Sequence, residues 1–308
     1  MKVLVFGAGG VGSVVGAFLA RTGHSVSLLG RPWHLDVVRK QGLSITGIWG
    51  DYRMKAFDCY HNTSEIKDRD LDLIILTVKS FDTGQALREL KPLMTDKTML
   101  LSLQNGLGNI ETILAAGVPP ENYLAGRVIF GVELEPGIAK VTVNADDVRI
   151  GALPGVTTKL SAFQMAQILN TAKIPASAVP DILTHIWAKV IYNCALNAIC
   201  SLRQMPYGRI LENADTKAQM EDVIRECYAV GRATGIVLDP PTPEDFIERM
   251  VKKWIPSTAA HEPSMLQDLR RGKRTDIDAL NGAIARLARE LGLQAPQNSE
   301  LARRISEL

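Results

Sequence analysis

Residues 1–31 read MKVLVFGAGGVGSVVGAFLARTGHSVSLLGR, and this stretch decides the fold. The apolar run Val3–Phe6 is typical of a buried strand, and the apolar positions between Val11 and Thr22 recur at the spacing of one helix face. Gly23 suits the residue after a helix end, and Val26–Leu29 is a second apolar run. A strand, a helix and a second strand in this order predict part of a parallel β-sheet.

A glycine-rich turn lies between the first strand and the helix and matches the pattern G-x-G-x-x-G. In such a turn the first glycine permits a tight bend, the second lets the backbone approach a pyrophosphate, and the third lets the helix pack against the strand. The helix N-terminus adds N–H groups for the phosphates. A plain glycine-rich loop is the alternative, but the flanking strands favour a dinucleotide site. Its predicted cofactor-binding residues are Gly7, Ala8, Gly9, Gly10, Val11 and Gly12.

The end of the second strand indicates which dinucleotide would bind. Sites for NAD generally carry Asp or Glu there, which holds the ribose hydroxyl group. Here the chain continues Leu28-Leu29-Gly30-Arg31, with no acidic residue. Because a guanidinium group suits a 2′-phosphate, the sequence favours NADP(H) over NAD. The alternative is that Arg31 is an ordinary exposed loop residue.

Two polar residues follow later strands of the predicted sheet. Lys79 comes directly after the apolar run Leu73–Val78, and Asn105 closely follows Met99–Leu103. Both therefore lie at the carboxyl edge of the sheet, where open α/β folds bind ligands. Lys79 is a candidate cofactor contact. Asn105 either marks a turn with Gly106 or makes a polar contact to the nicotinamide end of the cofactor or to the substrate.

The remaining patterns divide the chain into two halves. In the first half we expect a hairpin of Leu43–Ile48 and Tyr52–Phe57, a helix at Thr83–Leu90, strands at Leu124–Phe130, Ile138–Val143, Val148–Ile150 and Ile174–Val179, and a helix from about Thr157 to Thr171. The second half reads almost wholly as helix, at Asp181–Arg203, Asp215–Thr234, Pro243–Lys253 and Asp276–Leu291. The predicted class is α/β: a Rossmann-type, doubly wound NADP-binding domain over residues 1–179, followed by an all-helical substrate and catalytic domain over residues 180–308.

One predicted helix carries a polar stripe on an otherwise apolar surface. Lys189, Asn193 and Asn197 are spaced i, i+4 and i+8, so they lie on one helix face. Buried polar groups need partners, and this stripe could bind a ligand. Partial desolvation lowers the pKa of a lysine, which can then protonate an alkoxide formed by hydride addition. Alternatively, Lys189 reaches water and the asparagines bond between helices; the spacing alone favours neither.

Composition argues against several other classes of protein. The formal net charge is +2 and no dense Lys/Arg stripe occurs, so we expect no nucleic-acid partner. No apolar run reaches the roughly 18 residues of a membrane span, and the first one breaks into glycines too early for a signal peptide. The four cysteines lack metal-site spacing, so we expect buried thiols, no metal and a cytoplasmic location. Apolar helix faces in the second half suit either a homodimer or domain packing.

Taken together, these segments resemble the ketopantoate reductases (2-dehydropantoate 2-reductases), within the 6-phosphogluconate dehydrogenase-like group. The resemblance covers nearly the whole chain. It includes the glycine turn with its helix and second strand, the TVKS and QNG turns, the pattern W-x-K-x-x-x-N-x-x-x-N from Trp187, and Ser264–Asp268 followed by Thr275–Asp278. It implies NADPH-dependent reduction of a 2-keto acid to a 2-hydroxy acid. The reference substrate is ketopantoate and the product is pantoate, in the pathway to pantothenate and coenzyme A.

The resemblance also implies roles for individual residues. Lys189 would be the proton donor. Arg31 and Lys79 would meet the adenosine-phosphate end of NADPH, and Asp276 would lie beside the cofactor ribose and the substrate. Asn105 would lie between cofactor and substrate. The residues that would hold the substrate are Asn105, Asn193, Asn197 and Ser264.

Two departures from the family pattern keep the substrate open. Asp276 stands where the family usually has Glu, and its shorter side chain puts that contact in doubt. Tyr207 stands where the family often has Asn; its hydroxyl group could replace a hydrogen bond, or its ring could narrow the pocket. Another branched 2-keto acid is therefore the alternative substrate. A non-catalytic NADP(H)-binding redox sensor is a further alternative, which the Lys/Asn/Asn stripe disfavours, and a purely helical scaffold would leave the first half unexplained.

Overall fold

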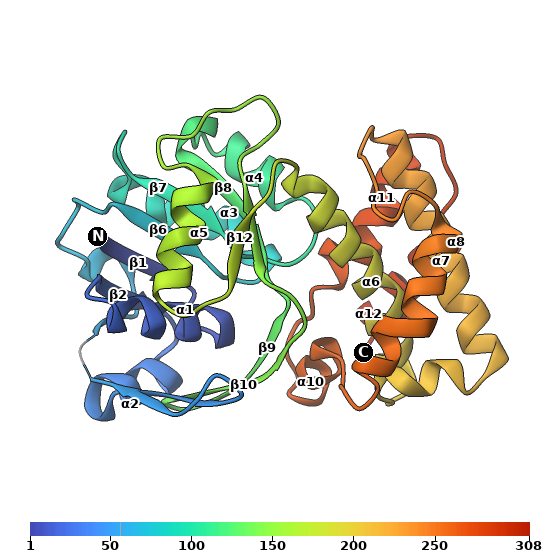
Figure 1. Cartoon of the computed structure of the whole chain (residues 1–308), viewed down its shortest axis with the longest axis horizontal. Coiled ribbons are helices and arrows are strands. Elements are labelled where there is room, and N and C mark those ends of the chain that lie inside the picture. Colours follow the sequence, from blue (N-terminus) through green and yellow to red (C-terminus); the bar gives the residue numbers. More distant parts are fainter. Residues whose placement is uncertain (56) are drawn as a thin grey trace. The chain divides into compact units, whose positions relative to one another are not determined.

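The computed structural model describes residues 1–55 and 57–308 (Figure 1). The chain forms two compact units, each with its own hydrophobic core. The first comprises Met1–Gln104 and Asn109–Ile182, and the second comprises Asn105–Gly108 and Leu183–Leu308. Among the described residues, no helix is both long and apolar enough to cross a membrane.

An eight-stranded sheet forms the centre of the first unit, in the order β12-β11-β8-β7-β6-β1-β2-β5. The six strands from β8 to β5 run parallel, whereas β11 is antiparallel to β8 and parallel to β12. The strands are β1 (Lys2–Phe6), β2 (Ser25–Leu29), β5 (Asp58–Tyr60), β6 (Leu73–Leu76), β7 (Met99–Ser102), β8 (Tyr123–Arg127), β11 (Val148–Gly151) and β12 (Ala176–Ala178). The predicted doubly wound sheet is confirmed.

Helices cover both faces of this sheet. Because the strand order reverses at β1, right-handed crossovers put α1 on one face and α3 and α4 on the other. Val5 and Ile75 pack in one core with α1 and α5, and the alternating Leu4 and Ile74 are fully buried on the opposite face. Figure 1 shows α5 in front of the sheet and α3 behind it. The helices are α1 (Gly10–Arg21), α2 (Pro32–Gln41), α3 (Thr83–Leu90), α4 (Asn109–Ala115) and α5 (Ala162–Thr171).

A second, four-stranded sheet packs against α1 and has the order β4-β3-β10-β9. Its strands are β3 (Leu43–Gly47), β4 (Tyr52–Met54), β9 (Phe130–Glu135) and β10 (Ile138–Asn144). The predicted hairpin is confirmed, with Leu43 opposite Met54, but its second strand ends at Met54, and Ala56 of the predicted range lies outside the described residues. The predicted strand Leu124–Phe130 is wrong in its extent, because the chain leaves β8 at Arg127 and starts β9 at Phe130. β9 then pairs antiparallel with β10, which runs parallel to β3.

The second unit is helical, as predicted. The predictions for its first two helices agree with α6 and α7 to within one residue, whereas α10 and α12 were not predicted. The predicted helix Pro243–Lys253 continues beyond α8 as a wider π-helical segment, Met250–Trp254. The α-helices are α6 (Ile182–Leu202), α7 (Ala214–Ala233), α8 (Pro243–Arg249), α9 (Ile255–Ser257), α10 (Ser264–Arg270), α11 (Asn281–Glu290) and α12 (Pro296–Ser306).

A buried polar network ties α6 to three other helices of this unit. The Glu226 carboxylate on α7 accepts hydrogen bonds from the backbone N–H and the side-chain amide of Asn298, at 2.9 and 2.8 Å, where α12 begins. Asn281 Nδ2 on α11 donates to Asn298 Oδ1 at 3.0 Å and to the carbonyl oxygen of Cys194 on α6 at 3.1 Å. Because buried polar groups are costly unless bonded, this network fixes α6 in one position among its neighbours.

The four cysteines are buried free thiols. Burial raises the pKa of the Cys200 thiol to about 12 and that of the Cys59 thiol to about 11, so both stay protonated near neutral pH. Within the described ranges, no group of three or more His, Cys, Asp or Glu residues is arranged to hold a metal ion.

Candidate active site

The glycine turn joins β1 to α1 at the carboxyl edge of the large sheet. The backbone N–H groups of Gly7 and Ala8 both donate to the carbonyl oxygen of Leu29, at 2.9 and 2.8 Å, so the turn is anchored to the end of β2. Gly7 has φ of 105°, a conformation that other residues rarely adopt. A Cβ atom at Gly12 would lie 2.6 Å from the carbonyl oxygen of Gly7. Glycine is therefore required at both positions for the turn to close.

The middle of the turn fits a pyrophosphate. The nearest neighbour that a Cβ atom at Gly9 would meet is the carbonyl oxygen of Gly7, at 3.8 Å, so the outer side of the backbone there is open. Gly10 is more confined, since a Cβ atom would lie 3.0 Å from the Cβ atom of Val132 on β9. The first turn of α1 contains no acidic residue that would repel a phosphate. An open backbone beside a helix N-terminus is the arrangement that dinucleotide phosphates require.

Arg31 lies beside this turn, one residue beyond Gly30 at the end of β2. It immediately precedes α2 and is exposed, and its side chain makes no hydrogen bond or ion pair within residues 1–55 and 57–308. The nearest acidic residue in the sequence, Asp36, lies 2.9 Å from Nε2 of His61. The guanidinium group of Arg31 is thus available to an anionic ligand at the edge where the turn lies.

Lys79 lies on the other side of the turn, after β6, and is half-buried. Thr77, two residues earlier, donates its hydroxyl hydrogen to the carbonyl oxygen of Gly7 at 2.8 Å. Gln104 donates through Nε2 to the carbonyl oxygen of Val78 at 3.0 Å. Sequence reasoning did not single out Thr77 or Gln104 as supporting residues, although both lie in the TVKS and QNG turns that carry the family resemblance.

In the second unit, Lys189 and Asn105 meet directly. The Nζ atom of Lys189 on α6 donates a hydrogen bond to Oδ1 of Asn105. The segment that holds Asn105 is fixed against Ala279: the N–H of Leu107 donates to the Ala279 carbonyl oxygen at 2.8 Å. Gly106 has φ of 85°, and a Cβ atom there would lie 2.6 Å from Cβ of Ala279. The sequence interpretation that left Lys189 free to reach water is therefore not what the structure shows.

Asp276 belongs to the same region. It is buried, with 8% of its surface exposed, and it precedes the short 3-10 turn Ile277–Ala279. Its carbonyl oxygen accepts from the N–H of Ala279 at 3.0 Å, and Ala279 in turn holds Leu107. The structure thus links three of the predicted site residues through one short stretch of backbone: Lys189, Asn105 and Asp276.

The two asparagines lie on the same face of α6 as Lys189 but have different surroundings. Asn197 is 4% exposed, and its Oδ1 accepts a hydrogen bond from the hydroxyl group of Tyr207 at 2.6 Å. Asn193 is half-buried, and its side chain makes no hydrogen bond in the part of the chain that the structure describes. Ser264 is exposed at the first residue of α10 and is not bonded to the other predicted residues.

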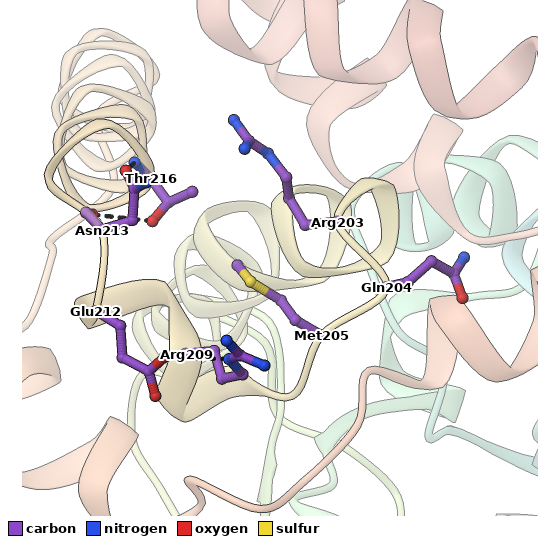
Figure 2. A pocket seen from close by; sticks show the side chains of 7 residues that line it. All are labelled: Arg203, Gln204, Met205, Arg209, Glu212, Asn213 and Thr216. Atoms are coloured by element: carbon purple, nitrogen blue, oxygen red, sulfur yellow. Dashed lines mark hydrogen bonds and ion pairs between the residues drawn. The ribbon is translucent and has the colours of Figure 1, made fainter.

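A pocket of the second unit lies away from these residues. It has a volume of about 440 Å³, between the C-terminal end of α6 and the start of α7 (Figure 2). An ion pair between Arg209 and Glu212, at 3.1 Å, closes part of its wall. None of the predicted site residues lines it. Its lining residues are Arg203, Gln204, Met205, Arg209, Glu212, Asn213 and Thr216.

Comparisons with known proteins identify the family of this chain. Residues 3–155 match the family model "Ketopantoate reductase PanE/ApbA", and residues 181–308 match its C-terminal counterpart. A 2-dehydropantoate 2-reductase from Aquifex aeolicus is 34% identical over 309 residues, covering 99% of this chain and 96% of the relative. One from Pyrococcus abyssi is 33% identical over 299 residues, covering 97% and 94%.

Solved structures give the same result. The crystal structure of a PanE/ApbA family ketopantoate reductase from Ralstonia eutropha has a TM-score of 0.88 and 34% identity, and covers 99% of this chain and 97% of that one. A D-mandelate dehydrogenase with NADH and anilino(oxo)acetate has a TM-score of 0.89 and 26% identity, and covers 100% and 98%. With both halves of the sequence matched and relatives aligned over nearly their full length, the chain belongs to the ketopantoate reductase family.

Proposed function

We propose that the protein reduces 2-dehydropantoate (ketopantoate) to pantoate with NADPH, a step of pantothenate and coenzyme A biosynthesis. Membership of the family makes it an NAD(P)-dependent oxidoreductase that acts on a small keto acid. The observation that carries the proposal is the hydrogen bond from Lys189 to Asn105, on the α6 face that also bears Asn193 and Asn197.

Lys189 is the proposed proton donor. NADPH, when bound, supplies the hydride that reduces the keto carbon. The ammonium group of Lys189 holds a proton at Nζ, stabilises the negative charge that develops on the keto oxygen, and then protonates that oxygen. Asn105 orients the ammonium group through its Oδ1 atom. The proposed substrate-holding residues are Asn105, Asn193, Asn197 and Ser264.

The proposed cofactor site is the glycine turn with Arg31, Lys79, Asn105 and Asp276. Preference for NADP(H) over NAD(H) is supported by the exposed guanidinium group of Arg31 and by the lack of an acidic residue at the end of β2. The open backbone at Gly9 supports binding of the pyrophosphate along this turn.

Steady-state assays with the purified protein test the proposal. Ketopantoate should accelerate NADPH oxidation strongly above the rate without substrate, and NADH should be a poorer donor. If neither ketopantoate nor any of a panel of other 2-keto acids raises NADPH oxidation above its background rate, while the cofactor still binds, the protein is instead a non-catalytic NADP(H)-binding redox sensor.

A second candidate is the same chemistry on another branched 2-keto acid. It is favoured by Tyr207, whose hydroxyl group donates a hydrogen bond to Oδ1 of Asn197. It is also favoured by the likeness to a D-mandelate dehydrogenase solved with anilino(oxo)acetate. A panel of 2-keto acids distinguishes the two, because a value of kcat/KM higher than that for ketopantoate would identify a different substrate.

We also propose that residues 1–179 form the cofactor-binding domain and that residues 180–308 form the domain that carries the catalytic lysine.

We further propose that the protein is a cytoplasmic homodimer. Apolar helix faces in the second half of the sequence suit a dimer interface. Light scattering coupled to size-exclusion chromatography tests the dimer: a mass near 33.6 kDa would show a monomer instead.

A further inference from the structure

Tyr207 and Asn197 form a buried pair, with Asn197 about two turns of α6 beyond the proposed catalytic lysine. Tyr207 is 5% exposed and Asn197 is 4% exposed. Burial raises the pKa of the Tyr207 hydroxyl well above its usual value, so this group remains protonated at all working pH values. Its hydrogen points at Oδ1 of Asn197 across 2.6 Å. Tyr207 therefore acts on Asn197 as a permanent hydrogen-bond donor.

The position of the Tyr207 ring is fixed by its surroundings. Its backbone N–H donates to the carbonyl oxygen of His261 at 3.1 Å, and the next N–H, of Gly208, donates to Ala259 at 2.9 Å. The ring stands edge-on to Tyr192 at 5.9 Å between centroids and packs beside His261 at 5.3 Å. Because backbone and ring are both held, the hydroxyl group cannot follow a reorienting Asn197 amide.

A primary amide has an oxygen that accepts and an NH₂ group that donates, so a fixed donor beside the amide determines which way round the amide stands. Because Tyr207 donates to Oδ1, the Asn197 amide is held with its NH₂ group turned away from the Tyr207 hydroxyl group. The Nδ2 atom makes no hydrogen bond within the described residues. Nδ2 of Asn197 is not fully enclosed, so it retains some accessible surface.

We propose that Tyr207 is a positioning residue that fixes the orientation of the Asn197 amide, so that Asn197 offers its NH₂ group to an oxygen acceptor of the substrate. The acceptor is a carboxylate or hydroxyl oxygen of the 2-keto acid. This inference rests on the proposed function, since it concerns the substrate of the same site. It assigns this chain's tyrosine a definite role, where the sequence left open a hydrogen bond or a narrowed pocket.

Two variants test the inference. Tyr207→Phe keeps the ring but frees the amide to turn, so the KM for ketopantoate should rise about tenfold, which is about 1.4 kcal/mol. The kcat value and the KM for NADPH should change less than about twofold, because Lys189 and the glycine turn are untouched. Asn197→Asp keeps an acceptor for Tyr207 but has no donor, so its KM for ketopantoate should rise at least as much. A merely structural role would not separate KM from kcat in this way.

Tyr192→Phe is the matched control. It removes another hydroxyl group, a half-buried one, from the same aromatic cluster, but that group is paired with Thr258 at 3.1 Å rather than with Asn197. Its KM for ketopantoate should stay at the wild-type value. Melting temperatures of all three variants show whether a kinetic change reflects loss of fold.

The same assays with 3,3-dimethyl-2-oxobutanoate, which lacks the hydroxyl group of ketopantoate, identify the acceptor. Equal rises in KM for both acids indicate the carboxylate, and a rise only with ketopantoate indicates the hydroxyl oxygen. Wild-type activity with unchanged KM in Tyr207→Phe, or tight substrate binding by Asn197→Asp, overturns the inference alone. A wild-type protein inactive on every keto acid overturns the proposed function and the inference together.

Discussion

The glycine turn of the first unit and the polar face of α6 in the second unit are built in opposite ways. The turn adopts its shape because side chains are missing: a Cβ atom at Gly7 or Gly12 would collide with backbone atoms. The α6 face is instead defined by side chains that partners from other elements hold in place, Asn105 for Lys189 and Tyr207 for Asn197. Steric requirements of the backbone are local in sequence, whereas the partners of a side chain are not.

The largest effect is expected from the α6 face. Lys189→Ala removes the proposed proton donor and the charge that stabilises the developing oxyanion, so kcat should fall by about 10²–10⁴. Cofactor binding to the turn should be unchanged. Single-turnover kinetics and NADPH fluorescence titration measure the two quantities.

Lys253→Ala is the control for this change, because Lys253 is an exposed lysine of the same unit in the segment Met250–Trp254. It should leave kcat as it is in the wild type. A Lys189→Ala variant that retains more than a tenth of wild-type kcat would remove the lysine from the mechanism.

The next effect concerns the cofactor side. Arg31→Ala should raise the KM for NADPH about 10- to 100-fold, because a hydrogen bond to a charged group contributes about 1.5–3 kcal/mol. The KM for NADH should stay nearly constant, since NADH has no 2′-phosphate. Initial rates with both cofactors give the comparison, and equal rises for both would mean that Arg31 does not recognise the phosphate.

Two glycines of the turn separate folding from cofactor binding. Gly12→Ala places a Cβ atom 2.6 Å from the Gly7 carbonyl oxygen and from Oγ1 of Thr77, and such overpacking costs about 1–3 kcal/mol. Its melting temperature should fall by roughly 2–12 °C. Gly9→Ala has room for the methyl group, so its melting temperature should hold while its affinity for NADPH falls. If Gly9→Ala bound NADPH as tightly as the wild type, the pyrophosphate would not pass over this residue.

The smallest effect is a pH dependence confined to the first unit. His34 on α2 is 1% exposed; its Nδ1 lies 3.2 Å from both the backbone nitrogen of Gly137 and the carbonyl oxygen of Glu135, and its Nε2 lies 3.1 Å from Oγ of Ser13. Burial lowers its pKa below the ordinary 6.5. Below about pH 6.5 the unfolded chain therefore binds a proton that the folded chain does not. Stability should fall with falling pH, by at most about 1.4 kcal/mol per pH unit, until the folded pKa is reached.

Melting curves of the wild type and of His34→Gln between pH 7.5 and 5.5 check this. The variant should be less stable at pH 7.5 but show a shallower loss on acidification. Parallel slopes for the two proteins would assign the acid sensitivity to other groups.

Local patterns predicted the parts of the fold that depend on local sequence. The apolar strands around the glycine turn, the hairpin from Leu43 and the long helices α6 and α7 all have strong periodicity, and all were predicted. The start of α12 is capped by Glu226 on α7, which accepts hydrogen bonds from the N–H groups of Gln297 and Asn298. Because Glu226 lies about 70 residues earlier in the chain, the local sequence did not predict α12. β5 and β9 were missed because short edge and connecting strands depend on their neighbours for pairing.

The candidate site was predictable to a similar degree. Helical spacing put Lys189, Asn193 and Asn197 on one face, and the structure has them on one helix. Helical spacing could not predict that Lys189 donates a hydrogen bond to Asn105, 84 residues earlier, or that Tyr207 donates one to Asn197. These pairings arise from tertiary packing, which one-dimensional periodicity does not encode.

The segment Asn105–Gly108 follows a strand of the sheet yet belongs to the helical unit. This has a consequence for protein engineering. A chimera that takes its nucleotide-binding half from one relative and its helical half from another has to draw these four residues from the donor of the helices. A single crossover after Ile182 would instead graft a foreign loop onto Ala279 and Lys189.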